Sequence, residues 1–135
     1  MVSACLLGHN CKYNGKNNRN QKVLDFVEGH EVIPACPEVT GGLPTPRVPS
    51  EIVDGVVRNR DGIDVDKEFR IGAKLELKKA IQEKVDLVVL QSRSPSCGSK
   101  QIYDGTFSKK IINGQGVFAT MLSEYGIKII DAEDL

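Results

Sequence analysis

Short apolar runs alternate with amphipathic segments along the chain, and this alternation predicts the main elements of the fold. Apolar runs bounded by glycine, proline or polar residues predict buried strands, at Val2–Leu7, Glu31–Ala35, Val85–Leu90 and Ile127–Ile130. Apolar residues at helical spacing predict helices, at Gln21–Gly29, Asp66–Lys84 and Gln115–Tyr125. Because strands and helices alternate, we expect an α/β fold with a mostly parallel sheet and right-handed crossovers.

The helix predicted at Asp66–Lys84 has the clearest periodicity. Its expected buried stripe consists of Ile71, Leu75, Ala80 and Ile81. The Lys and Glu residues of the same segment are expected to form a solvated face.

Three further segments separate these elements. Pro37–Pro49 contains four prolines and two adjacent glycines, so we expect an ordered functional loop without regular structure. Ile52–Val57 is a candidate strand, and Gln91–Gly105 is polar and reads as a loop.

Composition narrows the class of protein. The 135 residues are the size of one domain, and 18 basic residues balance 18 acidic ones. This neutral charge does not favour binding to a nucleic-acid duplex or an anionic membrane. The chain shows no apolar run long enough to span a bilayer and no secretory signal pattern, so we expect a cytoplasmic protein. In that reducing compartment its four cysteines are not expected to form disulfides.

Three of these cysteines occupy equivalent places in the predicted topology. Cys5 ends the first predicted strand, Cys36 follows the second, and Cys97 lies in the loop after the third. Ligands of open α/β sheets bind beyond the carboxyl ends of the strands. We therefore expect these thiols to converge at one edge of the sheet, with Cys11 near enough to approach them. A single free cysteine would be as consistent with an ordinary buried residue.

The spacing of the cysteines helps to distinguish between the possible kinds of metal site. No Cys-x-x-Cys pair is present, which disfavours a structural zinc site or a thioredoxin-type redox pair. Of the two histidines, His30 precedes its strand and His9 lies in a polar loop, so neither is a favoured catalytic partner. Iron–sulfur clusters accept thiolates from separate loops, and three thiolates leave one iron open.

Two other classes of function stay open at this point. One is a cluster-binding or zinc-binding sensor or sulfur carrier without catalysis. The other is a nucleotide- or metabolite-binding module with incidental cysteines, although no Gly-x-Gly-x-x-Gly follows the first strand.

Five motifs occur in order: Val-Ser-Ala-Cys-Leu-Leu-Gly (2–8), Cys-Lys-Tyr-Asn-Gly (11–15), Cys-Pro-Glu-Val-Thr-Gly-Gly-Leu-Pro-Thr-Pro-Arg (36–47), Ser-Pro-Ser-Cys-Gly (94–98) and Ile-Tyr-Asp-Gly-Thr-Phe (102–107). Over nearly the whole chain, this series resembles the short bacterial domain family associated with thiouracil desulfidase. The resemblance implies one Rossmann-like, three-layer domain over residues 1–135. It also implies a 4Fe-4S cluster held by Cys5, Cys36 and Cys97, with a fourth iron free to take sulfur from a substrate such as 2-thiouracil.

The implied reaction is a non-redox desulfuration in which water replaces sulfur and hydrogen sulfide leaves. Its expected catalytic residues are Glu38, Ser94 and Ser96, with Glu38 activating water and the serines bonding substrate or cluster sulfides. The expected substrate-binding residues are Arg47, Gly41, Gly42 and Asp104. The expected partner is a small thiolated base or nucleoside. The resemblance assigns no role to Cys11.

Overall fold

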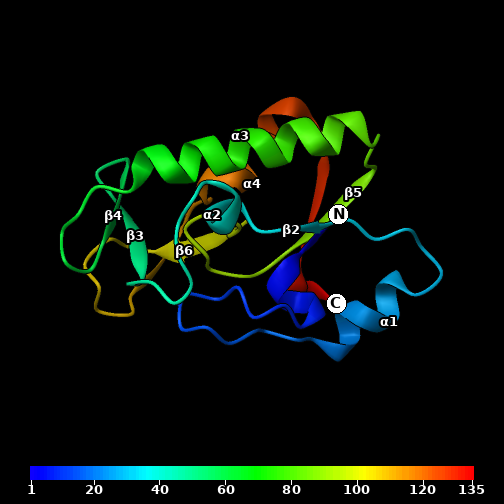
Figure 1. The fold of residues 1–135 in the computed structure, drawn as a ribbon, viewed down its shortest axis with the longest axis horizontal. Helices are drawn as coiled ribbons and strands as arrows, with labels where there is room; N and C mark the ends of the chain where they lie inside the picture. The colour runs from blue at the N-terminus through cyan, green and yellow to red at the C-terminus, as the bar shows by residue number, and fades with distance from the viewer.

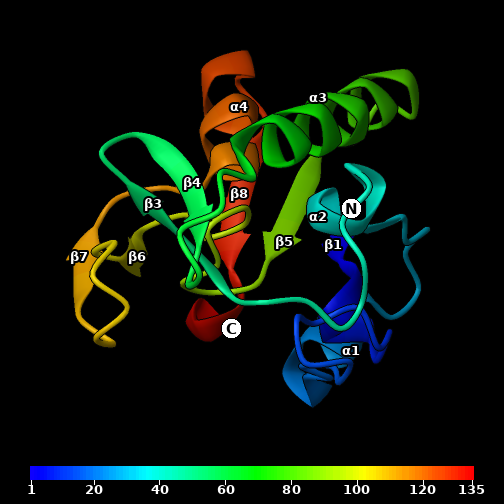
Figure 2. The same ribbon diagram turned by 60° about the vertical axis from the view of Figure 1, so that its left-hand side comes forward.

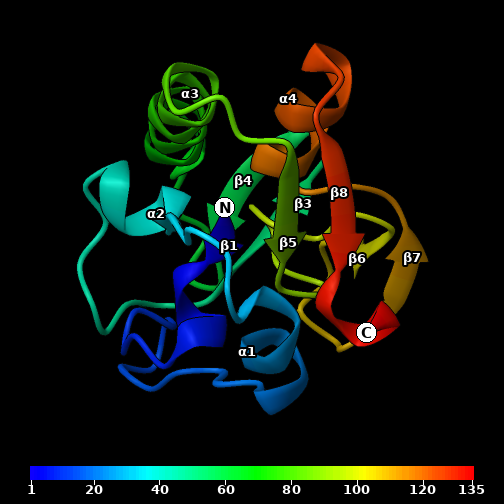
Figure 3. The ribbon, with the colours of Figure 1, turned by 90° about the vertical axis from the view of Figure 1, so that its right-hand side faces the viewer.

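A four-stranded parallel sheet forms the centre of the computed structural model, which describes residues 1–135. Its order is β2-β1-β5-β8, and every neighbouring pair is parallel. The bounds are Val2–Ser3 for β1, Pro34–Ala35 for β2, Leu87–Leu90 for β5 and Lys128–Asp131 for β8. Figure 3 shows β1, β5 and β8 side by side with their arrows in the same direction. The prediction of an α/β fold with a mostly parallel sheet is thus confirmed.

Helices cover both faces of this sheet and make a three-layer arrangement. The helices are α1 (Gln21–Val27), α2 (Pro37–Thr40), α3 (Asp66–Gln82) and α4 (Val117–Tyr125). Figure 1 shows α3 running along one side of the molecule with α2 and α4 against it, while α1 lies on the opposite side.

Residues of β5 point alternately into two cores, as the period of a strand requires. Val88 and Leu90 pack in one cluster with Phe69 of α3, and Val89 packs in a second cluster with Val23 of α1. Because both faces of β5 are buried, its sequence is apolar throughout.

Two antiparallel hairpins lie together beside the sheet (Figure 2). They pair β3 (Ser50–Val53) with β4 (Val56–Asn59), and β6 (Gln101–Tyr103) with β7 (Ile111–Asn113). The single strand expected at Ile52–Val57 is therefore wrong. Asp54 and Gly55 both have positive φ, at 50° and 79°, which is the conformation of a two-residue hairpin turn.

Three other expected boundaries also differ. The first strand ends at Ser3 and continues as a 3-10 helix, η1 (Ala4–Leu7). The segment at Pro37–Pro49 begins with the helix α2, because proline is tolerated at the first helical position, where no backbone N–H is needed. The loop expected at Gln91–Gly105 contains β6.

The buried face of α3 differs from the expected stripe, of which Ala80 is buried but Ile71, Leu75 and Ile81 are not. Ile71 and Leu75 are 41% and 48% exposed. The buried residues of α3 are Phe69, Gly72, Ala73, Glu76 and Ala80. The physical reason is the close approach of α2. A Cβ atom on Gly72 would lie 1.7 Å from the Pro37 carbonyl oxygen, so only a stripe of small residues admits this contact.

None of the helices combines the length and the apolar character that a membrane crossing requires.

Replacing Gly72 by alanine tests this packing. An alanine in a helix normally stabilises by about 1 kcal/mol relative to glycine. Here the clash with Pro37 should reverse the sign and lower the free energy of unfolding by about 3 kcal/mol. Urea denaturation measures the change. Lys74 is exposed on the same helix, and Lys74→Ala should change the free energy of unfolding by less than about 0.5 kcal/mol. A Gly72→Ala protein as stable as the native chain would show that α2 does not pack as described.

Candidate active site

A cleft of about 430 Å³ opens at the carboxyl ends of β1, β2 and β5. This is the edge at which parallel α/β sheets bind their ligands. All four cysteines line it. Cys5 comes from η1, Cys36 from the junction between β2 and α2, and Cys97 from the loop after β5, whereas Cys11 comes from the loop after η1. The topology thus brings together thiols that are far apart in the sequence.

The thiols are close enough to influence each other's ionisation. Burial raises the pKa of Cys5, a hydrogen bond from Asn18 opposes this shift, and the charges of Cys36 and Glu38 add to it. Burial also raises the pKa of Cys97 to about 12, with smaller contributions from Cys5 and Glu38. Removing these protons therefore requires a compensating positive charge, such as that of a bound metal.

The sulfur atoms of Cys5, Cys36 and Cys97 each have a hydrogen-bond donor beside them. A hydrogen bond from Asn18 lowers the pKa of Cys5, and hydrogen bonds from Ser3 and Ser96 lower that of Cys97, each against the effect of burial. The Cys11 thiol donates to Cys36, which lowers the pKa of Cys36 to about 7 and raises that of Cys11; the Val39 N–H also bonds to Cys36. Donors of this kind stabilise thiolates and orient metal ligands.

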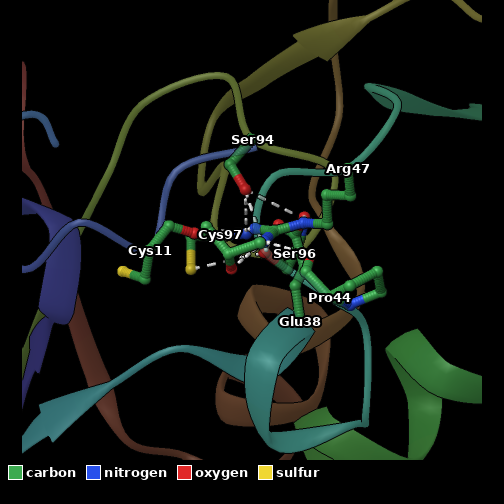
Figure 4. Close-up of polar contacts among 8 residues, drawn as sticks. Cys11, Glu38, Pro44, Arg47, Ser94, Ser96 and Cys97 are labelled. Atoms are coloured by element: carbon green, nitrogen blue, oxygen red, sulfur yellow. Dashed lines mark hydrogen bonds and ion pairs between the residues drawn. The ribbon is translucent and has the colours of Figure 1, made fainter. Parts of the chain in front are cut away.

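A chain of hydrogen bonds connects two serines to a carboxylate beside these thiols (Figure 4). Ser94 Oγ lies 2.9 Å from Ser96 Oγ, which lies 2.8 Å from Glu38 Oε2. Since an ionised carboxylate only accepts hydrogen bonds, Ser96 donates to Glu38, and Ser94 donates to Ser96. Arg47 Nε donates to the other carboxylate oxygen at 3.1 Å. Both oxygens of Glu38 are therefore fixed.

The loop that carries Ser96 and Cys97 is fixed by the start of α4. The Val117 N–H donates to the Pro95 carbonyl at 2.9 Å, and the Phe118 N–H donates to the Ser96 carbonyl at 2.9 Å. A Cβ on Gly116 would lie 2.5 Å from the Ser96 carbonyl carbon, so only glycine permits this approach. The serine chain is thus built on a helix terminus.

Arg47 connects the proline-rich segment to the loop after η1. Its Nη2 donates to the Cys11 carbonyl at 2.9 Å, and its backbone N–H donates to the Tyr13 carbonyl at 2.7 Å. Its Nη1 donates to the Pro44 carbonyl at 3.2 Å. Because Arg47 also bonds to Glu38, one side chain holds two loops against the catalytic carboxylate candidate.

Comparisons with known proteins identify the family of this chain. The family model for 2-thiouracil desulfurase matches residues 1–134. The chain belongs to the 2-thiouracil desulfurase family. Among relatives, the Bacillus subtilis (strain 168) protein YbbK is 38% identical over 145 residues, which cover 100% of this chain and 96% of that protein. The solved structure of the 4Fe-4S-dependent thiouracil desulfidase TudS is 39% identical, with a TM-score of 0.93 over 99% of this chain and 90% of that one.

Not every residue expected at the site of this desulfurase-family protein lies in the cleft. Glu38, Arg47, Ser94 and Ser96 line it together with the cysteines. The other three do not. Gly41 packs against the backbone of α3, where a Cβ would lie 2.0 Å from the Glu68 carbonyl oxygen, and Gly42 has positive φ in an open turn. Asp104 accepts hydrogen bonds from Thr106 in a local turn.

Several lining residues escaped the sequence reasoning. Ser3 and Asn18 contact cysteines, whereas Tyr103, Phe107 and Arg93 come from the segment after β5. Ser3 belongs to the first motif and could have been found there. Asn18 lies in an asparagine-rich loop that carries no distinguishing signal.

The donor set fits a cluster better than a single ion. No three His, Cys, Asp or Glu side chains lie close enough together to share one metal ion. In an iron–sulfur cluster each thiolate binds a different iron, so the sulfurs need only face a common space. Cys5, Cys36 and Cys97 do so around the cleft.

The contacts of Arg47 lead to a stability prediction. Arg47→Lys keeps the charge but loses the planar fork that reaches Glu38, Cys11 and Pro44. We expect the free energy of unfolding of the metal-free protein to fall by about 2 kcal/mol, measured by urea denaturation. Arg60→Lys is the control, because Arg60 lines the same cleft without a side-chain hydrogen bond, and it should change by less than about 0.5 kcal/mol. Equal losses in both variants would contradict the tethering role.

Proposed function

We propose that this protein holds a 4Fe-4S cluster on Cys5, Cys36 and Cys97 and hydrolytically removes sulfur from a thiolated pyrimidine such as 2-thiouracil. The observation that carries the proposal is the meeting of these three thiols in one cleft beside the fixed carboxylate of Glu38. Membership of the desulfurase family and the likeness to TudS support it.

The chemistry balances without electron transfer. One water replaces the sulfur of a thiocarbonyl, so that a carbonyl and hydrogen sulfide form. When bound, the cluster supplies an open iron as a Lewis acid for the substrate sulfur. The protein must then position the pyrimidine, hold the attacking water and take a proton from it.

Glu38 is the residue proposed to take that proton. Its side chain is 15% exposed, so a water molecule in the cleft can reach it. Arg47 holds Oε1 and Ser96 holds Oε2, and these two contacts keep the carboxylate in one orientation. A general base positioned in this way contributes through proton abstraction in the transition state.

The two serines are proposed to support this base and to orient the substrate. Ser94 Oγ accepts hydrogen bonds from the backbone N–H groups of Ser96 and Cys97, at 3.2 and 3.1 Å. The Ser94 hydroxyl in turn donates a hydrogen bond to Ser96 Oγ. Movement of the Ser96 hydroxyl toward a substrate atom would release Glu38 Oε2 toward water. Arg47, which already reaches Glu38, is proposed to bind a polar edge of the ring.

A sensor or sulfur carrier would use the same cysteines but has no evident use for a carboxylate fixed by two partners. This contact favours the enzyme over those alternatives. Anaerobic reconstitution with iron and sulfide, followed by incubation with 2-thiouracil, tests the choice. We expect uracil and sulfide to be released in equal amounts, whereas a stable cluster without release would support the sensor or carrier.

Glu38→Gln tests the proposed base. The amide keeps the shape and one acceptor oxygen, which can still accept from Arg47, while its NH2 group faces Ser96 and cannot take up a proton. We expect kcat for 2-thiouracil to fall by about 10²- to 10⁴-fold while iron content and the visible spectrum stay unchanged. Val39→Ala, on an exposed side chain of the same helix, serves as the control and should keep near-native kcat. Native kcat in Glu38→Gln would remove Glu38 from the mechanism.

The proposed ligand assignment predicts that substituting the four cysteines has different effects on cluster loading. Serine in place of Cys5, Cys36 or Cys97 should prevent stable loading of the cluster, seen as iron per chain after desalting. Cys11→Ser should load normally, because it removes a hydrogen-bonding neighbour of Cys36 and not a ligand. Loss of iron in Cys11→Ser, together with retention in one of the other three, would overturn the assignment.

A further inference from the structure

Glu76 is a buried carboxylate that the proposed mechanism does not use. It lies in the middle of α3, and the residue is only 4% exposed. Burial of a charged or polar group is costly unless a partner satisfies it. The identity of its partner therefore carries information about its role.

That partner is the backbone of a proposed cluster ligand. The Cys36 N–H donates to Glu76 Oε2 at 2.9 Å, across 40 residues of sequence. Cys36 is the N-cap residue of the short helix α2, and Val39, three residues later, has no side-chain acceptor that could reach back to the Cys36 N–H as in a capping box. Glu76 thus supplies from α3 an acceptor that the local sequence does not provide.

A neighbouring contact holds the same segment on its other side. Lys79 Nζ donates to the Pro34 carbonyl at 3.2 Å and lies 3.9 Å from Glu76 Oε1. Lys79 and Glu76 therefore bond to the backbone at Pro34 and at Cys36, on either side of Ala35. One turn earlier, Gly72 brings α3 into contact with Pro37. Together these contacts place the ligand-bearing junction directly on a long, rigid helix.

Neither of the other proposed ligands is held by α3. Cys5 is held by η1 and Asn18, and Cys97 by the loop that packs on α4. The position of Cys36 relative to the other two thus depends on the pairing of β2 with β1 and, beyond the end of β2, on the contact with α3. Because three thiolates must face one cluster, a shift of one ligand backbone should loosen the whole site.

We propose that Glu76 is a positioning residue for the metal centre, which fixes Cys36 as a cluster ligand through its backbone N–H. This inference rests on the proposed function, since it concerns the same cluster. It differs from a purely structural role of Glu76, in which loss of the contact would weaken the fold without a specific effect on the cluster.

Three substitutions separate these roles. Glu76→Gln keeps an acceptor for the Cys36 N–H and should hold the cluster as the native chain does. Glu76→Leu keeps the volume but removes the acceptor. Glu76→Asp is the second disruptive variant, for the case in which the leucine protein does not fold, because it withdraws the carboxylate by one methylene. Phe69→Leu is the control: Phe69 is fully buried on α3, so the substitution destabilises the fold, but neither side chain has an acceptor for the Cys36 N–H.

The experiment measures loss of the reconstituted cluster to a ferrous chelator under anaerobic conditions, at a temperature where circular dichroism shows every variant folded. Cluster loss should be about 10- to 100-fold faster in the leucine or aspartate variant than in the native, glutamine and Phe69→Leu proteins. The electron paramagnetic resonance spectrum of the reduced cluster should change in the same variants alone.

Two results would overturn the inference: a native lifetime in both disruptive variants, or an equal acceleration in Phe69→Leu. A native protein that loads a cluster without releasing sulfide would contradict the proposed function but leave Glu76 to be judged by cluster lifetime. A native protein that takes up no cluster would overturn both.

Discussion

Parallel pairing of β1 with β2 and with β5 is the constraint on which the site depends. It places the carboxyl ends of three strands at one edge, and the segments that follow them carry Cys5, Cys36 and Cys97. Each segment is then fixed by a different part of the fold: the loop after η1, helix α3 and the start of α4. The sheet brings the thiols together, and these three supports set their directions.

Much of this arrangement could be predicted from the sequence. The apolar run around Val88 predicts a strand because both faces of the central strand β5 are buried, and the shorter run around Ile129 predicts the edge strand β8 beside it. From that topology the convergence of three distant cysteines follows. Glu38, Arg47, Ser94 and Ser96 belong to segments next to those cysteines, so their presence in the cleft also follows from the motifs.

The remainder depends on tertiary contacts that periodicity does not reveal. The large aliphatic side chains Ile71 and Leu75 suggested the wrong buried face of α3, because close contact with α2 selects Gly72 and Ala73 instead. Glu76 was expected on the solvated face of α3. It is buried instead, and its carboxylate accepts a hydrogen bond from the N–H of Cys36, 40 positions away. Gly41 and Gly42 serve helix packing and a turn, roles that local sequence cannot distinguish from close approach to a ligand.

The central claim is that three cysteines hold a cluster and leave one iron without a protein ligand. A crystal structure of the anaerobically reconstituted protein tests it most directly. We expect iron bonded to the Sγ atoms of Cys5, Cys36 and Cys97, a fourth iron open to the cleft, and Cys11 beside Cys36 without a bond to iron. A fourth bond from Cys11, or a single metal ion in place of the cluster, would contradict it.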